Sequence, residues 1–432
     1  MSASNLHGVS RVEGEIRPGG DKSISHRALI LGALAKGRSY LNDLSPSADV
    51  RSTAECLTAC GAAIRLHDDG RVSLDGAGPG RSLKTPAASL DCGNSGSTMR
   101  MLAGVIAGHE MVARLDGDSS LRRRPMRRIA EPLQRMGAGV QMSAADTAPV
   151  TVAGHRPLTA ITYASPVASA QVKTAVLVAG LHADGATTVS EPMPSRDHTE
   201  RLLSLCGVRV IRDGNSLTVI PGELEPFGMR VPQDISSAAP FMCLAAGRPG
   251  WAVRCPGLGL NPLRTGIVDV LRQMGAQVDV DEDPPAGGIE PAGLVEVRGA
   301  SLQSLLIAGE MVPRLIDELP VIAVLATQAE GTTVIRDAAE LRVKESDRIA
   351  AICRGLGAMG ATCEMTADGM TIVGPVNLHP ANVDADGDHR LAMAFAVAAC
   401  LAVGPGSTRI EGAETVEVSY PSFLADLDAV SH

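Results

Sequence analysis

Aromatic residues are scarce in this sequence, since Phe, Trp and Tyr together make up 2% of its 432 residues. Ala, Val, Leu, Ile and Met must therefore fill most of the hydrophobic core. Common signatures of nucleotide P-loops, metal sites and serine hydrolases are also missing, namely G-x-x-x-x-G-K-[ST], H-E-x-x-H and G-x-S-x-G. The ten histidines form no cluster with the spacing of metal ligands. We therefore expect neither a bound metal nor a redox cofactor.

Long apolar segments and paired cysteines are missing as well. The longest apolar run, 391–403, is too short to cross a bilayer and predicts a buried helix. The nine cysteines contain no C-x-x-C, and the first residues lack the apolar region of a signal peptide, so we expect free thiols in a cytoplasmic protein. The formal net charge of −9 argues against broad nucleic-acid binding, so any basic site must be local.

One pattern of helix and strand recurs along the chain. A helix-like stretch ends in a sequence such as LTACGAAIRL, LQRMGAGVQM, LSLCGVRVIR, LRQMGAQVDV or LGAMGATCEM. The glycine of this sequence stands at 61, 137, 207, 275 and 360, where a left-handed residue would stop the helix and release the chain into a strand. Gly-Ala ends many helices by chance, but five copies at roughly even spacing favour duplication. A sixth copy would be cut short by the C-terminus.

The six expected units divide naturally into three and three. A Pro/Gly-rich stretch at 221–234 lies midway, and a second, RPGG, precedes Asp21; both are typical of linkers or hinges. We therefore expect one domain at 21–229 and another at 230–432, with 1–20 joining the second. Each unit would contain two helices and several strands, which predicts an α/β (α+β) protein with two domains.

Polar residues stand just before or at the start of the apolar helices. Ser, Asn and Asp are ordinary N-caps there, because their oxygens accept hydrogen bonds from free backbone N–H groups. Capping does not explain the cations that accompany them, since Lys or Arg in a first helical turn opposes the helix dipole. We place four cations in this position, namely Lys22, Arg27, Arg100 and Arg390. A bound phosphate or carboxylate would account for them.

Two short basic segments add further cations. They are LRRRPMRR at 121–128 and RVKESDR at 342–348. The first could be a solvated run or a nucleic-acid patch, and the second a helix laced with ion pairs. The residues by themselves predict a two-domain protein whose helix termini and cations bind a polyanionic small molecule.

Six motifs, in order along the chain, resemble those of the 5-enolpyruvylshikimate-3-phosphate synthases, a family of enolpyruvyl transferases. They are GDKSISHR at 20–27, GNSGSTMR at 93–100, RRPMRR at 123–128, SAQVKTA at 169–175, RVKESDR at 342–348 and DHRLAM at 388–393. The resemblance implies two similar domains, each of three βαβαββ units in an inside-out α/β barrel, with the active site in the interdomain cleft. It implies transfer of the enolpyruvyl group of phosphoenolpyruvate to the 5-hydroxyl of shikimate 3-phosphate, in the shikimate pathway to chorismate and aromatic amino acids. We expect a monomer that needs no cofactor and binds neither nucleic acid nor membrane.

The resemblance also implies roles for the matching residues. For catalysis, it implies Asp317 as the base for the 5-hydroxyl, Glu345 as the acid at the methylene carbon, and Lys22 as the other candidate for the acid. For shikimate 3-phosphate, it implies Lys22, Ser23, Arg27, Ser169, Ala170, Gln171, Arg196, Asp317 and Lys344. For phosphoenolpyruvate, it implies Lys22, Asn94, Gly96, Arg124, Gln171, Arg348, His389 and Arg390. It implies no metal ligand.

The sequence departs from some members of the family in two places. A basic residue near the C-terminal aromatic-Pro motif is absent from 418–421, and 195–198 replaces a tyrosine near the shikimate ring and resembles another branch. Gly96 stands where Ala accompanies glyphosate tolerance in some relatives, so we expect a glyphosate-sensitive enzyme. Two alternatives stay open. One is an enolpyruvyl transferase acting on UDP-N-acetylglucosamine, although its usual Lys-Asn pair is Lys22-Ser23 here; the other is a non-catalytic binder of anions or nucleic acid.

Overall fold

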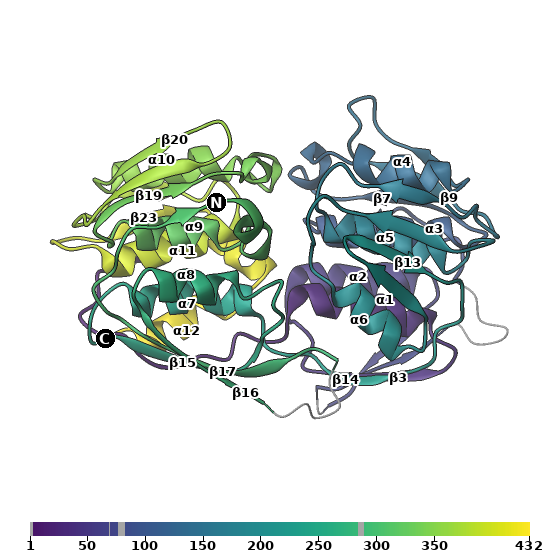
Figure 1. Ribbon diagram of the computed structural model, residues 1–432, viewed down its shortest axis with the longest axis horizontal. Coiled ribbons are helices and arrows are strands. Elements are labelled where there is room, and N and C mark those ends of the chain that lie inside the picture. The colour runs from purple at the N-terminus through teal and green to yellow at the C-terminus, as the bar shows by residue number, and fades with distance from the viewer. Residues whose placement is uncertain (1–2, 69, 77–82, 284–288) are drawn as a thin grey trace. The chain divides into compact units, whose positions relative to one another are not determined.

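The computed structural model describes residues 3–68, 70–76, 83–283 and 289–432. The chain divides into two units, each with its own core (Figure 1). The N-terminal unit holds Gly20–Val231, joined by Ile289 and Glu290. The C-terminal unit holds the chain up to Gly19 and most of the remainder from Pro232 to His432.

Several helices begin at a capping side chain, and five end next to the recurrent glycines. Those of the N-terminal unit are α1 (Lys22–Leu34), α2 (Ala48–Ala59), α3 (Gly96–Ala107), the 3-10 helix η1 (Leu121–Arg123), α4 (Arg127–Arg135), α5 (Ala170–Gly180) and α6 (His198–Leu205). Those of the C-terminal unit are α7 (Ile235–Ala246), α8 (Gly266–Gln273), η2 (Gly309–Arg314), α9 (Leu319–Ala326), η3 (Ala339–Val343), α10 (Arg348–Ala358), α11 (His389–Leu401), η4 (Ala413–Val418) and α12 (Phe423–Val430). The helices that end next to the recurrent glycines are α2, α4, α6, α8 and α10.

In the described part of the chain, short strands form three sheets in each unit. The N-terminal unit contains β3 (Arg38–Asn42), β4 (Ala63–Leu66), β5 (Val72–Asp75), β6 (Leu90–Asp91), β7 (Val112–Asp116), β8 (Gly139–Gln141), β9 (Val150–Ala153), β10 (Thr162–Ala164), β11 (Thr187–Ser190), β12 (Val210–Asp213), β13 (Ser216–Val219) and β14 (Gly228–Arg230). The C-terminal unit contains β1 (Ala3–Leu6), β2 (Glu13–Glu15), β15 (Ala252–Gly259), β16 (Gln277–Glu282), β17 (Ala292–Arg298), β18 (Leu306–Ile307), β19 (Gly331–Ile335), β20 (Thr362–Met365), β21 (Met370–Gly374), β22 (Asn382–Asp384) and β23 (Thr408–Glu411).

The sheets repeat one plan, which confirms the predicted α/β fold. In the sheet β6-β7-β9-β8, the first pair is parallel and the other two pairs are antiparallel. Its elements follow the order β6, α3, β7, α4, β8, β9, which is the expected βαβαββ unit. The sheets β10-β11-β13-β12 and β18-β19-β21-β20 have the same plan and the same chain order.

Three sheets are completed by a strand from a distant part of the chain. The sheet β14-β3-β5-β4 takes β14 from the end of the N-terminal unit. The sheet β16-β17-β15-β2 takes β2, and the three-stranded sheet β1-β23-β22 takes β1, both from the first residues of the protein. The sixth copy is therefore not simply truncated, because its third strand comes from the opposite end of the chain.

The five recurrent glycines all have left-handed backbone conformations. Their φ angles are 93° at Gly61, 96° at Gly137, 78° at Gly207, 104° at Gly275 and 93° at Gly360. Residues with a Cβ rarely adopt this conformation, whereas glycine does so without steric cost. The structure thus confirms that these glycines end a helix before a strand.

Three apolar helices pack together in the centre of each unit, with sheets around them (Figure 1). In the C-terminal unit these are α7, α9 and α11, whose residues are all buried. In the N-terminal unit α3 contacts both α1 and α5. Burial on every side explains why these helices are apolar all round. Within the described residues, we find no helix with the length and apolar character that a membrane span requires.

Candidate active site

The predicted residues of the N-terminal unit gather around the first turns of α1, α3 and α5. Asp21 caps α1 by accepting from Ile24 N–H at 2.9 Å, and Ser95 caps α3 by accepting from Thr98 N–H at 3.1 Å. Ser169 caps α5 through a longer contact of 3.4 Å. Capping is therefore the local role of these three residues, as their type predicts.

The expected positions of two cations were wrong. Lys22 and Arg390 are the first and second residues of α1 and α11. Arg27 and Arg100 lie in the second turns of α1 and α3, because each helix begins several residues earlier than its cation. The unfavourable interaction between a cation and the N-terminal end of the helix dipole is confined to the first turn. The dipole argument therefore applies to Lys22 and Arg390 and not to the other two.

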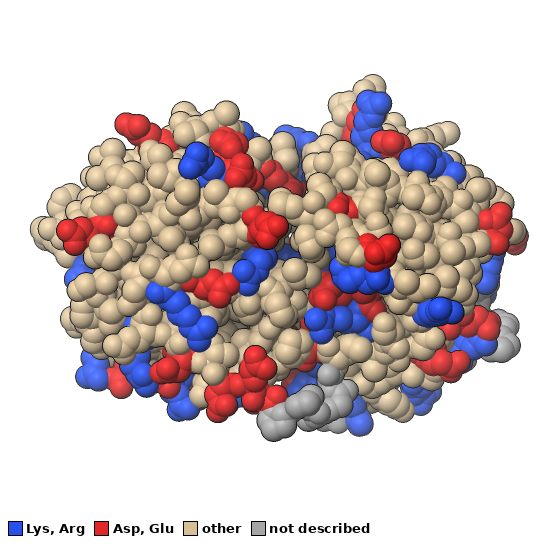
Figure 2. Space-filling view, in the orientation of Figure 1, with Lys and Arg blue, Asp and Glu red and all other residues tan. Residues whose placement is uncertain are grey.

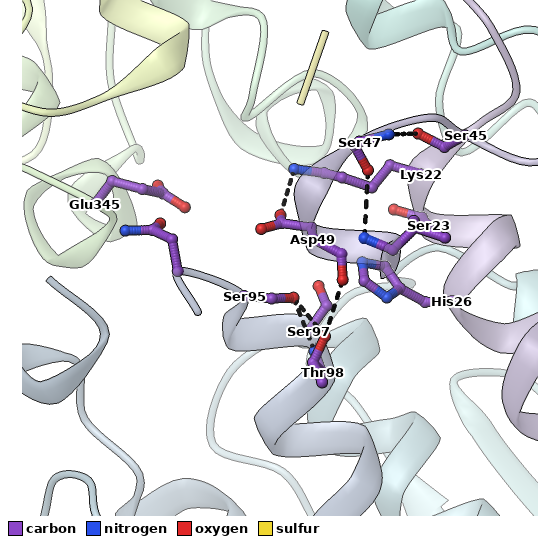
Figure 3. A network of polar contacts seen from close by, with 12 residues as sticks. Lys22, Ser23, His26, Ser45, Ser47, Asp49, Ser95, Ser97, Thr98 and Glu345 are labelled. Carbon is purple, nitrogen blue, oxygen red and sulfur yellow. Dashed lines mark hydrogen bonds and ion pairs between the residues drawn. The ribbon is translucent and has the colours of Figure 1, made fainter. Parts of the chain in front are cut away.

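A polar network holds Lys22 and links α1, α2 and α3 (Figure 3). Lys22 Nζ forms an ion pair with Asp49 Oδ2 at 2.8 Å. The backbone carbonyl of Asp49 accepts from Thr98 Oγ1 at 3.2 Å, and Thr98 Oγ1 lies 2.7 Å from Thr53 Oγ1. His26 Nδ1 joins the network at 2.7 Å from Thr53 Oγ1. These contacts fix Lys22 at the N-terminus of α1.

His26 is uncharged at neutral pH in this network. It is fully buried, and burial lowers its pKa well below the usual value of 6.5. The nearby Lys22 and Arg27 lower it further, because two cations disfavour a third. The positive charge in the first two turns of α1 thus resides on Lys22 and Arg27.

Arg27 joins three helices of the N-terminal unit from a buried position. Its Nη1 donates to the Ser23 carbonyl at 2.7 Å and its Nε donates to Thr199 Oγ1 at 2.7 Å. Its Nη2 contacts the Ala170 carbonyl at 3.3 Å, at the first residue of α5. Arg196 Nη1 lies 3.4 Å from Ser23 Oγ. The structure thus brings together most of the residues expected to bind shikimate 3-phosphate.

Asn94 and Arg124 form a second group next to α3. Arg124 Nη2 donates to Asn94 Oδ1 at 2.5 Å, and Asn94 Nδ2 donates to Asp118 Oδ2 at 2.6 Å. A Cβ on Gly96 would lie 2.8 Å from Arg100 Nη1 and 3.3 Å from Arg124 Nη1. The missing side chain at Gly96 therefore leaves room for two guanidinium groups.

Gln171 connects this group to α5. Its Oε1 accepts from Arg100 Nη1 at 2.7 Å, and its Nε2 donates to Ser97 Oγ at 2.8 Å. Arg100 was singled out as a cation at a helix start but was given no role in the site. Its contacts show that it orients Gln171.

The predicted residues of the C-terminal unit gather around Arg348. Arg348 Nε donates to Asp388 Oδ2 at 2.7 Å, its Nη2 to Glu345 Oε2 at 2.7 Å and its Nη1 to Asp317 Oδ1 at 3.4 Å. Burial disfavours the charged guanidinium, but the three carboxylates outweigh this effect and raise the pKa of Arg348. Arg348 is therefore a permanent cation that holds the expected base and the expected acid in place.

Lys344 also contacts the expected base. Its Nζ is 3.4 Å from Asp317 Oδ1, so Asp317 contacts two cations. Asp317 and Glu345 are each partly accessible to solvent, with side-chain exposures of 17% and 16%. An oriented carboxylate that solvent can reach is able to accept or donate a proton.

The last two predicted residues stand at the start of α11. Asp388 caps this helix by accepting from Arg390 N–H at 2.8 Å, and Arg390 Nη1 donates to the Ser236 carbonyl at 2.8 Å. His389 is the first residue of α11 and is buried. Arg264, which the sequence did not single out, donates to Ser236 Oγ at 2.6 Å.

Reasoning from the sequence gave no role to three acidic residues that hold predicted site residues in place. Asp49 holds Lys22, Asp118 holds Asn94, and Asp388 holds Arg348. Asp388 received no role from the sequence, although its place in the DHRLAM motif could have drawn attention to it. Asp49 and Asp118 stand outside the motifs. Among the described residues, no group of three or more His, Cys, Asp or Glu is arranged to hold a metal ion.

Comparison with known proteins identifies the family. The model of the family described as EPSP synthase (3-phosphoshikimate 1-carboxyvinyltransferase) matches residues 6–427. The chain is 49% identical to the 3-phosphoshikimate 1-carboxyvinyltransferase of Geobacillus kaustophilus (strain HTA426), over 97% of this chain and 98% of the relative. It is 45% identical to that of Bacillus subtilis (strain 168), over 98% of each.

Solved structures give the same result for the fold. A structure of EPSP synthase from Acinetobacter baumannii has a TM-score of 0.86 and 39% identity, covering 99% of this chain and 98% of the other. The enolpyruvyl transferase NikO from Streptomyces tendae has a TM-score of 0.78 at 19% identity, covering 99% and 96%, and shares the fold alone. These relatives favour neither transfer to UDP-N-acetylglucosamine nor a non-catalytic binder. The chain belongs to the EPSP synthase (3-phosphoshikimate 1-carboxyvinyltransferase) family.

Proposed function

We propose that this chain transfers the enolpyruvyl group of phosphoenolpyruvate to the 5-hydroxyl of shikimate 3-phosphate and releases phosphate. Its family supports the choice of substrates. The observation that carries the chemistry is the cluster around Arg348, in which cations hold Asp317 and Glu345. Two oriented carboxylates suit an addition–elimination reaction, because one step removes a proton from an alcohol and another adds a proton to carbon.

The reaction proceeds in two steps. In the addition, Asp317 takes the 5-hydroxyl proton as the oxygen bonds to C2 of phosphoenolpyruvate, and Glu345 or Lys22 gives a proton to the methylene carbon. The product is a tetrahedral intermediate that still carries the phosphate on C2. In the elimination, a proton leaves the new methyl group, the double bond returns, and phosphate departs with the electron pair of its C–O bond. A positioned acid or base contributes about 10²–10⁴-fold to such steps.

Binding of shikimate 3-phosphate is proposed for the residues around α1 and α5. Lys22, Ser23 and Arg27 come from α1, and Arg196 contacts Ser23. Backbone N–H groups at the start of α5, the Ser169 hydroxyl and the nearby cations make this a suitable place for a phosphate. Ala170, Gln171, Asp317 and Lys344 complete the proposed set.

Binding of phosphoenolpyruvate is proposed for the remaining cations. Arginine suits both of its anionic groups, because a guanidinium can donate two parallel hydrogen bonds to a phosphate or a carboxylate. The proposed set is Lys22, Asn94, Gly96, Arg124, Gln171, Arg348, His389 and Arg390. Holding both substrates in a reactive orientation lowers the activation free energy by up to about 7–11 kcal/mol.

We further propose that the enzyme is a cytoplasmic monomer that does not bind nucleic acid. Its nine cysteines are free thiols, which fits a reducing compartment. On the face drawn in Figure 2, acidic and basic side chains are interspersed, which does not favour a track for a polyanion. Light scattering with and without an oligonucleotide measures the mass of the protein and any complex.

A phosphate-release assay tests the proposed reaction. Purified protein with shikimate 3-phosphate and phosphoenolpyruvate should release phosphate, and EDTA should not prevent this. Mass spectrometry should find the enolpyruvyl ether of shikimate 3-phosphate. Absence of release, or release only when UDP-N-acetylglucosamine replaces shikimate 3-phosphate, would contradict the proposal.

A further inference from the structure

A buried carboxylate outside the motifs lies directly after β11. The side chain of Glu191 is only 3% exposed, and both of its oxygens accept hydrogen bonds. Oε1 accepts from the backbone N–H of Ser169 at 2.8 Å. Oε2 accepts from the hydroxyl of Ser195 at 2.8 Å and contacts its backbone N–H at 3.3 Å. One side chain therefore joins the start of α5 to the loop before α6.

The charge of this carboxylate is balanced by an equally buried lysine. Lys173 Nζ lies 3.1 Å from Glu191 Oε2 and 2.9 Å from Glu200 Oε1, and its side chain is 2% exposed. The same ammonium donates to the Ser195 carbonyl at 3.1 Å. Lys173 belongs to α5 and Glu200 to α6, so the lysine joins the same two regions as Glu191.

Buried ionic groups are costly unless each is paired and hydrogen-bonded, so their geometry tolerates little movement. In this cluster every oxygen of Glu191 has a partner, and those partners belong to two different segments. Displacing either segment would leave a buried carboxylate oxygen or backbone N–H without its partner. The cluster therefore fixes the distance between Ser169 and Ser195.

The two fixed segments carry groups that we assign to the phosphate of shikimate 3-phosphate. Ser169 and Ala170 stand at the start of α5, and Arg196 directly follows Ser195. One phosphate group can accept from both segments only when they are held at a suitable distance. The side chains of Glu191, Lys173 and Glu200 need not touch the ligand for this.

We propose that Glu191 is a positioning residue for the phosphate of shikimate 3-phosphate. Through Ser169 and Ser195, it holds the N-terminus of α5 and Arg196 at the spacing that one phosphate group requires. This inference rests on the proposed function, because it concerns the same acceptor substrate. It predicts that loss of the Glu191 contacts weakens recognition of the phosphate rather than the transfer of the enolpyruvyl group.

Glu191→Gln, with Glu200→Gln as its matched control, tests the proposal. A glutamine side chain has one acceptor oxygen, so it cannot serve both segments, whereas Glu200 contacts Lys173 and Arg212 and neither serine. Both substitutions remove one negative charge next to Lys173. We expect Glu191→Gln to raise the KM for shikimate 3-phosphate about tenfold, equivalent to about 1.4 kcal/mol. The KM for phosphoenolpyruvate and kcat should change less than twofold, and Glu200→Gln should change all three less than twofold.

Ser195→Ala is a second variant that keeps the charge of Glu191. It removes the hydroxyl contact at 2.8 Å and leaves both backbone contacts in place. We expect a smaller rise in the same KM, about threefold. Binding of shikimate without its phosphate, measured by calorimetry, should be unchanged in all three variants. Thermal unfolding of each variant identifies any that fails to fold, in which case Ser195→Ala decides the outcome.

The two proposals fail in different ways. If the unmodified enzyme releases no phosphate from its two substrates, the proposed function is wrong. If it turns over but Glu191→Gln and Ser195→Ala leave the KM for shikimate 3-phosphate unchanged, Glu191 is not a positioning residue. An equal rise in Glu200→Gln, or an equal loss of binding for shikimate without phosphate, would also overturn the inference, because either would indicate a general structural effect.

Discussion

Each unit contains a buried arginine that we assign to substrate binding, yet the two arginines have different surroundings. Arg27, in the N-terminal unit, donates to threonine hydroxyls and backbone carbonyls. Arg348, in the C-terminal unit, contacts Asp317, Glu345 and Asp388. Neutral acceptors satisfy the donors of an arginine without cancelling its charge, whereas carboxylates do both.

This difference indicates that Arg27 serves mainly to bind substrate, whereas Arg348 also positions the catalytic carboxylates. Hydrogen bonds to neutral oxygens orient the guanidinium of Arg27, which suits a bound phosphate. Arg348 contacts three carboxylates, whose combined negative charge exceeds its own positive charge. Arg348 is therefore suited to holding the acid and the base, in addition to any contact with substrate. The predictions below test this difference, beginning with the largest expected effect.

Replacement of the expected base should abolish catalysis with little effect on binding. Asp317→Ala removes the carboxylate between Lys344 and Arg348. We expect kcat to fall by about 10²–10⁴-fold. Both KM values should stay within about threefold, since the cations that bind the substrates remain. Steady-state kinetics measure both effects, and an unchanged kcat would remove Asp317 from the mechanism.

Loss of Arg348 should destabilise its unit more than loss of Arg27 destabilises the other. Arg348→Met leaves carboxylates without their cation, which we expect to cost about 3–5 kcal/mol. Arg27→Met removes hydrogen bonds to neutral groups and should cost about 1–3 kcal/mol.

Urea unfolding followed by two probes separates these effects. Trp251, the single tryptophan, lies in the C-terminal unit, so its fluorescence should shift in Arg348→Met and not in Arg27→Met. Circular dichroism reports both units. Equal losses of stability for the two variants would contradict the contrast between carboxylate and neutral surroundings.

Alanine at position 96 should weaken phosphoenolpyruvate binding without unfolding the protein. The added Cβ would meet the ends of two arginine side chains, which can move, at 2.8 Å and 3.3 Å. We expect the KM for phosphoenolpyruvate to rise about tenfold, equivalent to about 1.4 kcal/mol. Inhibition by glyphosate should weaken as well, because we expect Gly96 to make the enzyme sensitive.

Gly104→Ala, in the same helix, is the matched control for stability. Its Cβ would lie 2.4 Å from the backbone oxygen of Ala175, where α3 and α5 approach each other. Backbone atoms cannot yield as easily, so we expect a loss of stability of about 1–3 kcal/mol. If thermal unfolding shows Gly96→Ala to be the less stable of the two variants, the side chains of Arg100 and Arg124 cannot move aside as we expect.

Mild acid should destabilise the N-terminal unit through its buried histidines, which is the smallest effect. Burial first, and then His109 and Arg156, lower the pKa of His182 to about 3. The unfolded chain takes up a proton near the usual value of 6.5, while the folded unit does not, so stability declines as pH falls from about 6.5 towards 3. His182→Leu should flatten part of this decline in circular dichroism. An unchanged pH profile would show that other groups cause the loss.

Local features followed from single residues and their neighbours in sequence. The five recurrent glycines adopt positive φ, and Asp21, Ser95 and Ser169 cap helices, because steric freedom and capping act within one turn. The repeated pattern predicted units of two helices and several strands for the same reason, and the family resemblance implied their βαβαββ order. The dipole argument failed for Arg27 and Arg100, because it depends on the first residue of each helix, which the sequence places only to within a turn.

What the sequence determined by itself was thus the repeated unit, its caps and turns, and, through its motifs, the family and the residue types of the site. Only the tertiary structure decided which groups meet. The sheets are completed by β1, β2 and β14 from distant segments, Asp49 meets Lys22, and Glu191 meets both Ser169 and Ser195. These contacts join residues that are far apart along the chain. Their geometry follows from the packing of whole helices and sheets, which no local pattern of residues specifies.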